Sequence, residues 1–476
     1  MQPLSGLDAA FLYLETPRTP MHVAGLSIFE RTGDGARLEF ATFRAHVAAR
    51  VHLVRTYRER LVMVPLGLGK PYWIDDPDFD LDLHLHHVTL PSPGAWHDLR
   101  DLFAAVVSRP LNRARPLWEM TFVEGLEAVD GVPPGSCALI AKVHHAAIDG
   151  LSGGAMLGVL LDPTPDVADA HPPAAWKPAQ PPGPVRVLAR SGLDFLRWPV
   201  KAFDLLSATV RSAARLPFVP HVEGADVHPW LYTSPHTRLN VPVSADRVWD
   251  CLSIPLARVK AVKALVPGST VNDVLLALSA GALRRYLAEK GDLPQQPLIA
   301  MMPISTRPAA ASTAMGNQVS AILVDLATDE ADPLLRLHRI HAGVRQNKAL
   351  HQAVEAQALV DSSQLIPFSL ATIAARLYTN SQVTRAINPI FNCVITNIPG
   401  PQQPVYLRGA RMVANMGMTP VYDGVGLLIT IFSYDGVLTI SATSCREIMP
   451  DTERFIAYLE MSLTELEAGL TTGLET

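Results

Sequence analysis

The pattern of hydrophobic positions predicts a chain of mixed strands and helices. Residues 136–143 (SCALIAKV) form an apolar run preceded by prolines and a glycine, which is typical of a short buried strand. Residues 79–86 alternate strictly between polar and apolar side chains and predict a half-buried strand. Ser5 is predicted to cap a short helix that runs to residue 14, and Thr270 a long helix over 271–289. Further strands are expected at 23–30, 118–124, 248–254, 298–303, 320–326, 392–396, 425–433 and 437–443, and further helices at 40–62, 98–107, 333–353 and 451–468.

A proline-rich stretch divides the chain into two halves, each of which mixes strands with helices. Such a composition marks an extended linker rather than a packed domain. We therefore predict an N-terminal domain over residues 1–162, a linker over 163–240 and a C-terminal domain over 241–476. The prolines that mark the linker are Pro163, Pro165, Pro172, Pro173, Pro178, Pro181, Pro182 and Pro184.

Composition narrows the class of protein. The 476 residues carry a net charge of −5, so no basic surface for nucleic acid is expected. The four cysteines are scattered without C-x-x-C spacing, which favours reduced thiols in the cytoplasm. The N-terminus does not resemble a secretory leader, and no run approaches the ~20 apolar residues of a membrane-spanning helix. These features predict a cytoplasmic protein.

The most informative sequence is the motif H-H-x-x-x-D-G, formed by His144, His145, Asp149 and Gly150. The motif follows the predicted strand at 136–143, so the paired histidines lie where that strand ends. Imidazole has an unperturbed pKa of about 6.5, which suits proton removal near neutral pH. Because adjacent strand residues point to opposite faces, we expect one histidine to face a cavity and the other the packed core.

Two other chemistries compete with a general base at this motif. A metal site is disfavoured because the spacing is not H-E-x-x-H and no cysteine pair lies nearby. The separate cluster of His84, His86 and His87 is interpreted as a polar strand face without a metal. Residues 150–154 (GLSGG) satisfy the G-x-S-x-G pattern of serine hydrolases, but six residues intervene between the strand and this pattern. We therefore favour acid–base catalysis.

Further short motifs, in a fixed order, run from one end of the chain to the other. Together with H-H-x-x-x-D-G, they resemble the bacterial bifunctional wax ester synthase/diacylglycerol acyltransferase family. H-H-x-x-x-D-G alone is shared with condensation domains of peptide synthetases and related CoA-dependent acyltransferases, so the resemblance depends on the ordered set. The further motifs are residues 4–12 (LSGLDAAFL), 19–23 (TPMHV), 116–118 (PLW), 272–273 (ND), 316–317 (GN) and 396–401 (TNIPGP).

The resemblance implies a fold and an activity. The fold would be two chloramphenicol-acetyltransferase-like α/β domains, with the active site in a tunnel between them. The activity would be an acyl-CoA-dependent O-acyltransferase that esterifies long-chain fatty alcohols, diacylglycerol or both, giving wax esters and triacylglycerol. Acyl-CoA is then a co-substrate, and no further cofactor or metal is expected. Two alternatives stay open on the same fold, namely acyl transfer to an amine or a polyketide-type hydroxyl, and non-catalytic lipid binding.

The same resemblance assigns roles to the motif residues. His145 is expected to be the general base that takes the proton from the acceptor hydroxyl, without a covalent acyl-enzyme. His144 is expected to orient or pack. Asp149 and Gly150 are expected to shape the loop that holds the histidines.

Outside the motif, the expected roles are less specific. Pro116, Leu117 and Trp118 either line the acyl channel or simply begin an apolar strand. Asn272 and Asp273 fall in the first turn of the helix at 271–289, where the positive helix end suits acidic or oxygen-rich groups. Asn272 has either a direct functional role or a capping role, and Asp273 is expected to favour the helix terminus.

Residues 185–216 predict a helix with one basic face, interrupted at Pro199 and weakened at Gly192. Two interpretations stay open. The segment is an amphipathic connector between the domains, or it is an interfacial helix that brings the enzyme to an anionic membrane, on its inner face, or to a lipid droplet surface. The residues within an arc of about 80° are Arg186, Arg190, Arg197, Lys201, Arg211 and Arg215.

Overall fold

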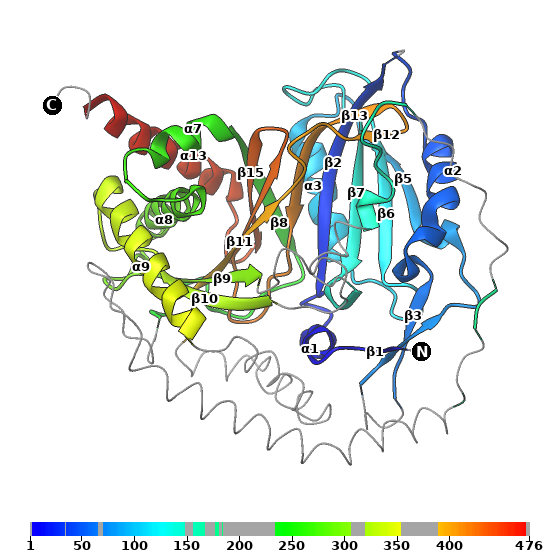
Figure 1. Ribbon diagram of the computed structural model, residues 1–476, viewed down its shortest axis with the longest axis horizontal. Helices are drawn as coiled ribbons and strands as arrows, with labels where there is room; N and C mark the ends of the chain where they lie inside the picture. The colour runs from blue at the N-terminus through cyan, green and yellow to red at the C-terminus, as the bar shows by residue number, and fades with distance from the viewer. Residues whose placement is uncertain are drawn as a thin grey trace.

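Two six-stranded sheets stand side by side in the described part of the computed structural model, and helices cover their outer faces (Figure 1). A smaller sheet joins three short strands near the N-terminus. The expected mixed α/β class is therefore confirmed. The small sheet is ordered β1 (Gln2–Pro3), β4 (Tyr72–Asp75) and β3 (Glu59–Val62). The structure describes residues 2–33, 35–64, 70–147, 156–166, 177–179, 183, 234–305, 319–353 and 389–472.

The first large sheet carries the motif strand near its centre. β7 lies between β2 and β6 and is antiparallel to both. Leu139 of β7 packs in one hydrophobic cluster with Phe43 of α2 (Phe40–Arg50), whereas Ile140 packs in another with Phe103 of α3 (Trp96–Ser108). Because adjacent strand residues face opposite sides, the two helices cover opposite faces of this sheet. The strand order is β12 (Tyr406–Leu407), β13 (Ala410–Met418), β2 (His22–Thr32), β7 (Cys137–His144), β6 (Trp118–Glu124) and β5 (Leu85–Thr89).

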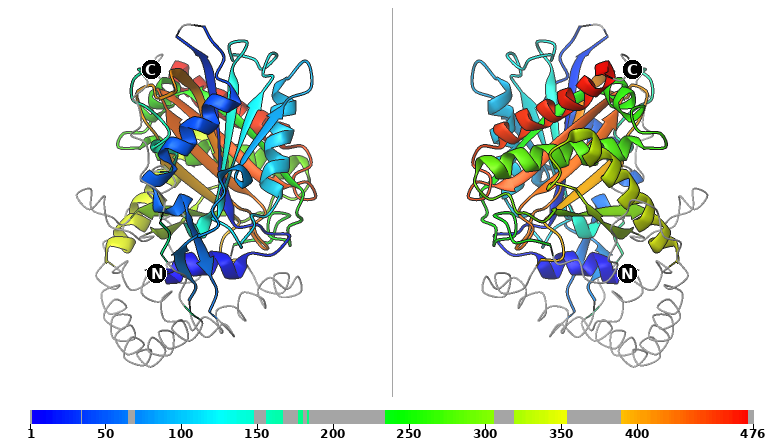
Figure 2. Two further views of the ribbon diagram at one scale, coloured as in Figure 1. Left: turned by 90° about the vertical axis from the view of Figure 1, so that its right-hand side faces the viewer. Right: turned by 90° about the vertical axis from the view of Figure 1, so that its left-hand side faces the viewer.

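The second large sheet is covered on one face by a layer of helices (Figure 2). These are α7 (Leu256–Lys263), α8 (Val271–Glu289), α9 (Pro333–Ala353) and α13 (Thr452–Thr472). α8 is buried along nearly its whole length, which explains its apolar sequence, and it contacts the other three. The strand order is β10 (Val319–Asp325), β9 (Ile299–Ser305), β11 (Cys393–Pro399), β14 (Leu428–Tyr434), β15 (Val437–Cys445) and β8 (Arg247–Pro255).

The C-terminal half of the chain contributes two strands to the first large sheet. β12 and β13 come from the C-terminal half but lie in the first sheet, where β13 pairs with β2. Gly417 of β13 allows a close approach to the second sheet, since a Cβ there would lie 2.6 Å from the Phe432 ring and 3.0 Å from the Ala24 carbonyl oxygen. Trp249 of β8 packs edge-on against Phe103 of α3, with the ring centroids 4.6 Å apart. The domain boundaries proposed from the sequence stay a prediction. The structure adds that β12 and β13, from the C-terminal half, lie in the first large sheet.

Several elements match their predicted bounds, the others mostly begin and end within four residues of them, and two predictions are wrong in part. The strand at 118–124 and the helices at 271–289 and 333–353 are confirmed to the residue. The segment predicted as mostly helix at 40–62 is an α-helix only to Arg50. Two short 3₁₀ turns follow, η1 (Val51–Leu53) and η2 (Arg55–Tyr57), separated by Val54 in the extended conformation that β-branched residues favour, and the segment ends in β3. The strand predicted at 79–86 begins only at Leu85, because the Asp80 carboxylate accepts the Asp82 N–H (3.0 Å) and stabilises a local 3₁₀ turn, η4 (Leu81–Leu83).

Candidate active site

Backbone hydrogen bonds to both neighbouring strands fix the histidine turn. β7 ends at His144, and the chain continues as the short 3₁₀ turn η5 (His145–Ala147). The His144 N–H donates to the carbonyl of Leu117 (2.9 Å), at the start of β6, and the His145 N–H donates to the carbonyl of Met21 (2.8 Å), just before β2. The two histidine backbones are therefore held from opposite sides.

His144 is the packed member of the pair. It is fully buried, and its Nδ1 accepts the Ala146 N–H (3.0 Å). Nδ1 has no proton when it accepts, so Nε2 carries the ring proton. Nε2 lies 3.4 Å from the Oε2 of Glu15, close enough for a strong electrostatic interaction although the alignment is not that of a regular hydrogen bond. One ring nitrogen thus braces the turn, while the other is directed to a carboxylate.

Glu15 is a buried acidic residue beside the motif. It ends α1 (Gly6–Leu14), and its carboxylate accepts the Met21 N–H (3.3 Å) and the Arg113 Nε–H (2.5 Å). Burial alone would raise the pKa of Glu15, but its interactions with His144 and with the Arg113 guanidinium lower it to about 2. The carboxylate is therefore ionised throughout the physiological pH range.

His145 is the chemically accessible member of the pair. Its side chain is only half-buried and lies flat on the ring of Phe11 from α1, with centroids 3.8 Å apart and planes 12° apart. Its Nδ1 is buried and has no hydrogen-bond partner among the described residues. Burial, reinforced by repulsion from His144, lowers the pKa of His145 to about 4. At neutral pH the imidazole is uncharged and has a free lone pair, as a base requires.

A second group of buried polar residues lies behind the motif strand. Lys142 is 2% exposed; its ammonium forms an ion pair with Glu119 (3.0 Å) and donates to the carbonyls of Val106 and Arg109. His22 of β2, the register partner of His144, lies beside it. Burial, followed by the charge of Lys142, lowers the pKa of His22 to about 3. This group gives the histidine turn a rigid, neutral imidazole on its buried side.

Pro116, Leu117 and Trp118 are all buried and support the turn rather than open onto it. The Leu117 carbonyl holds the His144 backbone, as described above. The Trp118 indole N–H donates to the carbonyl of Tyr57 (3.0 Å), whose ring it meets edge-on. These contacts favour the interpretation that residues 116–118 begin a buried strand. Their role in lining an acyl channel stays a prediction.

Asn272 and Asp273 lie at the start of α8, in the second half. Thr270 is the N-cap residue, as predicted, and it forms a capping box with Asp273, in which the Asp273 carboxylate accepts the Thr270 N–H (2.8 Å). The same carboxylate binds His341 of α9 (2.9 Å). The Asn272 amide contacts the Met302 sulfur (3.0 Å). No hydrogen bond or ion pair among the described residues joins either side chain to the histidine turn, so a direct role for Asn272 stays a prediction.

The predicted histidine cluster on β5 is divided by the structure. The sequence placed His84 on the strand, but in the structure it precedes the strand. Its Nδ1 contacts the Trp118 carbonyl (2.7 Å), and its ring stacks on the Trp118 indole. His86 and His87 are exposed. Among residues with a described position, no three His, Cys, Asp or Glu side chains gather as metal ligands. Asp149, Gly150 and the G-x-S-x-G pattern at 150–154 lie outside the described residues.

Comparison with known protein families assigns this chain to one of them. Residues 4–275 match the wax ester synthase/diacylglycerol acyltransferase catalytic domain, and residues 315–467 match the C-terminal domain of the same family. The chain belongs to the wax ester synthase/diacylglycerol acyltransferase family. It is accordingly an acyltransferase. The catalytic-domain match runs from α1 through the histidine turn to the first turn of α8, across the proline-rich stretch.

Individual relatives agree with the family assignment. The chain is 37% identical over 487 residues to a putative diacylglycerol O-acyltransferase of Mycobacterium tuberculosis, covering 98% of this chain and 100% of the relative. A probable diacylglycerol O-acyltransferase of the same organism is 36% identical over 466 residues, covering 97% and 98%.

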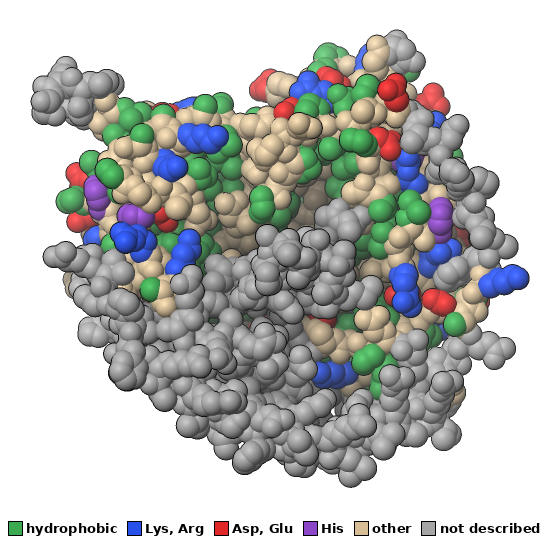
Figure 3. Space-filling model, in the orientation of Figure 1, with side chains coloured by type: hydrophobic (Ala, Val, Ile, Leu, Met, Phe, Trp, Pro, Cys, Tyr) green, Lys and Arg blue, Asp and Glu red, His purple; other side chains and the backbone are tan. Residues whose placement is uncertain are grey.

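Solved structures confirm the architecture. The wax ester synthase/diacylglycerol acyltransferase from Marinobacter aquaeolei VT8 aligns with a TM-score of 0.68 at 29% identity, over 98% of this chain and 99% of that one. The starter condensation domain of rhizomide synthetase aligns with a TM-score of 0.55 at 14% identity, over 97% and 94% of the chains, which shows a shared fold alone. No helix in the described ranges is both long and apolar enough to span a membrane. The tunnel stays a prediction, although Figure 3 shows the surface hollowed between the two halves.

The residues that sequence reasoning missed are those that support the motif from a distance. Glu15 and Phe11 precede it by about 130 residues; Phe11 falls in the motif at 4–12 that carries the resemblance, but the local sequence of neither residue indicates that it lies at the histidine turn. The pairing of β2 with β7 brings α1 onto the turn. Lys142 lies inside the predicted strand and is an unusual residue to bury, so it was the one signal that the sequence itself offered.

Proposed function

We propose that this acyltransferase moves the acyl group of acyl-CoA to the hydroxyl of a long-chain alcohol or of diacylglycerol. The products would be wax esters and triacylglycerol. The family name covers both products, and the mycobacterial relatives are named for the diacylglycerol reaction. The placement of His145 carries the proposal, because a half-buried and uncharged imidazole held at a strand end is suited to activate a hydroxyl.

In the proposed reaction His145 is the general base. The imidazole accepts the hydroxyl proton while the oxygen attacks the thioester carbonyl carbon, forming the new C–O bond. The C–S bond then breaks, and the imidazolium returns its proton to the departing thiolate. A thiol is a far better leaving group than an alkoxide, so activation of the alcohol is the demanding step. No covalent acyl-enzyme is required, and acyl-CoA is the only co-substrate that the scheme needs.

The surroundings of His145 support this role in two ways. The Phe11 ring covers one face of the imidazole and fixes its plane. On the other side of the turn, the ionised Glu15 faces Nε2 of His144, whose Nδ1 accepts the Ala146 N–H, so the carboxylate helps to hold the turn that carries His145. We assign His144 and Glu15 to positioning and Asp149 to loop structure.

A thiol-release assay with palmitoyl-CoA tests the proposal. Hexadecanol and dioleoylglycerol should be acylated, whereas an amine and water should not. His145→Ala should lower turnover by about 10²–10⁴-fold, the usual contribution of a general base. His97→Ala is the matched control, because His97 is an exposed histidine on α3. A His145→Ala variant that folds and keeps a tenth of wild-type turnover would contradict the assignment. Loss of activity in folded Ser152→Ala would instead indicate a serine nucleophile.

Association with a membrane or lipid droplet surface is a separate part of the proposal. It depends on residues 185–216, which lie outside the described residues, and therefore on their sequence alone. Changing Arg190, Arg197 and Lys201 to Glu should weaken sedimentation with anionic liposomes and spare turnover of a short, soluble alcohol. Unchanged liposome binding would leave the segment as a connector between the domains.

A further inference from the structure

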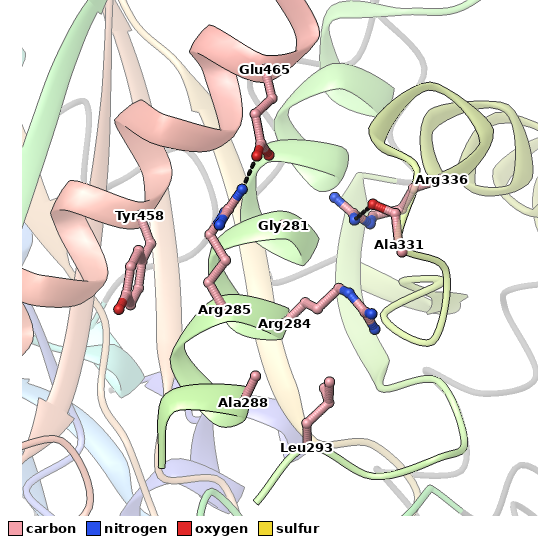
Figure 4. Close-up of a pocket in the computed structure, with 9 residues that line it drawn as sticks. All are labelled: Gly281, Arg284, Arg285, Ala288, Leu293, Ala331, Arg336, Tyr458 and Glu465. Carbon is pink, nitrogen blue, oxygen red and sulfur yellow. Dashed lines mark hydrogen bonds and ion pairs between the residues drawn. The ribbon is translucent and has the colours of Figure 1, made fainter. Parts of the chain in front are cut away.

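A cavity of about 320 Å³ opens among the helices that cover the second sheet, lined by residues of α8 and α13 and of the chain around the start of α9 (Figure 4). None of its lining residues belongs to the histidine turn or to the elements that hold it. The side chains that give the cavity its chemistry are Arg284, Arg285, Arg336, Tyr458 and Glu465.

The lining of this cavity carries more positive than negative charge. Arg285 forms an ion pair with Glu465 across the α8–α13 contact. Arg284 donates instead to the carbonyls of Thr328 (2.6 Å) and Asp329. Backbone carbonyls accept hydrogen bonds but carry no net charge, so they leave the guanidinium charge unneutralised. Three arginines against one carboxylate give the lining a net charge of 3 − 1 = +2.

Arg336 is the most informative of the three arginines. It is only 4% exposed, and its Nε and Nη2 donate to the carbonyls of Glu330 and Ala331. Its Nη1 has no hydrogen-bond partner among the described residues. Figure 4 shows one guanidinium nitrogen directed away from Ala331 toward α8. There, a Cβ at Gly281 would lie 3.0 Å from Nη1, so the glycine leaves that nitrogen room.

The carboxylates of Glu330 and Asp332 lie near enough to raise the pKa of Arg336 somewhat, but neither belongs to the cavity lining, and among the described residues neither forms an ion pair with Arg336. The Asp329 carboxylate is bound by Arg339 (3.0 Å), and the Glu330 carboxylate accepts the Asp332 N–H (2.9 Å) at the exposed surface. Burial lowers the pKa of Arg336 to about 10, and the charges of Arg284 and Arg285 contribute to this shift. The three cations therefore repel one another in the absence of an anion.

We propose that this cavity binds a phosphate monoester through Arg284, Arg285 and Arg336. Such a group carries about −1.5 to −2 charges at neutral pH, which matches the excess on the lining. Planar guanidinium groups suit the tetrahedral oxygens of phosphate because each can donate two parallel hydrogen bonds. The cavity is larger than a phosphate ion, and Ala288 and Leu293 offer an apolar wall for the organic part of the ligand. The site is independent of the proposed acyl transfer.

Isothermal titration calorimetry with the full chain tests the site, with inorganic phosphate and glycerol 3-phosphate as probes. Arg284→Gln should weaken binding about tenfold, the size expected for a lost charge-assisted hydrogen bond. Glu465→Gln should strengthen binding, because it frees Arg285 from its ion pair. Arg446→Gln is the matched control; this exposed arginine pairs with Asp246 at the end of β15. Thermal melts verify that each variant is folded.

The two variants must move the affinity in opposite directions. Equal affinity in Arg284→Gln, or weaker affinity in Glu465→Gln, would overturn the proposal, as would the absence of binding to every probe. Phosphatidylcholine vesicles containing phosphatidic acid distinguish the source of the ligand. Binding to these vesicles that Arg284→Gln weakens, without binding of glycerol 3-phosphate, supports a lipid headgroup. Binding of glycerol 3-phosphate without vesicle binding supports a soluble ligand.

Discussion

The lowered pKa of His145 makes a quantitative prediction about the pH dependence of catalysis. A base acts in its unprotonated form, and burial holds the pKa of His145 at about 4 instead of 6.5. With a pKa of 4, the neutral fraction falls by only about 3% between pH 7 and pH 5.5. With an unperturbed pKa, the same change of pH would reduce the neutral fraction about eightfold. Activity should therefore be present above the folded-state pKa and lost as the pH falls through about 4.

The measurement is kcat/KM for palmitoyl-CoA, since this parameter reports the ionisation of the free enzyme. Thiol release is followed with a disulfide reagent that responds at acid pH, and circular dichroism at each pH verifies that the protein is folded. Phe11→Leu supplies an internal test. The smaller side chain admits water to one face of the imidazole, so the midpoint should move up toward 6.5.

Two results would refute this reasoning. One is a wild-type midpoint near 6.5, which would mean that His145 is solvated as in a peptide. The other is an unchanged midpoint in a folded Phe11→Leu variant, which would show that the stacked ring does not control the environment of the base. The low pKa also has a chemical consequence, because a weaker base gains less from proton transfer.

Three further predictions concern the supporting residues. Glu15→Gln should lower kcat about tenfold or more with little change in the KM for acyl-CoA, since it removes a charge that faces His144, whereas Glu124→Gln at the end of β6 should not; a rise in KM alone would contradict positioning. Trp118→Ala should lower the free energy of unfolding by about 3–5 kcal/mol in chemical denaturation, because this indole is 1% exposed; a loss below about 1 kcal/mol would contradict its place in the core. The pKa of His22 is lowered to about 3, so the unfolded chain takes up a proton below about pH 6.5 that the folded chain does not. The free energy of unfolding should therefore fall as the pH drops toward 4, and in His22→Asn its dependence on pH should be smaller by about one proton.

The elements with the strongest local signals were predictable from the sequence. Thr270 and Asp273 are spaced as a capping box, and the apolar sequence that follows them is the helix α8 to the residue. Residues 79–86 show where local reasoning fails. Their alternation is typical of a strand, but the Asp80 side chain offers the backbone a competing hydrogen bond. A pattern of hydrophobicity carries no information about that competition.

For the candidate active site, the sequence predicted the motif residues themselves but not the distant segments that pack around them. The motif spacing placed both histidines at a strand end, and the expectation that only one of them is packed holds: His144 is buried, whereas His145 lies half-buried against Phe11. What the sequence does not contain is the long-range pairing that surrounds them. β13, from more than 250 residues later, closes the sheet beside β2, and α1 reaches the turn only because β2 pairs with β7.

These long-range contacts explain why two adjacent and chemically identical side chains differ. Both imidazoles leave the same strand end, so the difference cannot come from their own chemistry. His144 has its Nδ1 committed to the Ala146 backbone and its Nε2 directed to an ionised carboxylate. The ring of His145 stacks on the apolar ring of Phe11, and its Nδ1 has no hydrogen-bond partner among the described residues. An imidazole engaged at both nitrogens is poorly placed to accept a proton from substrate, whereas a neutral and unengaged one is ready to do so. The proposal that His145 is the base therefore rests on what its neighbours leave free, and it would reverse if Glu15 were found beside the second histidine instead of the first.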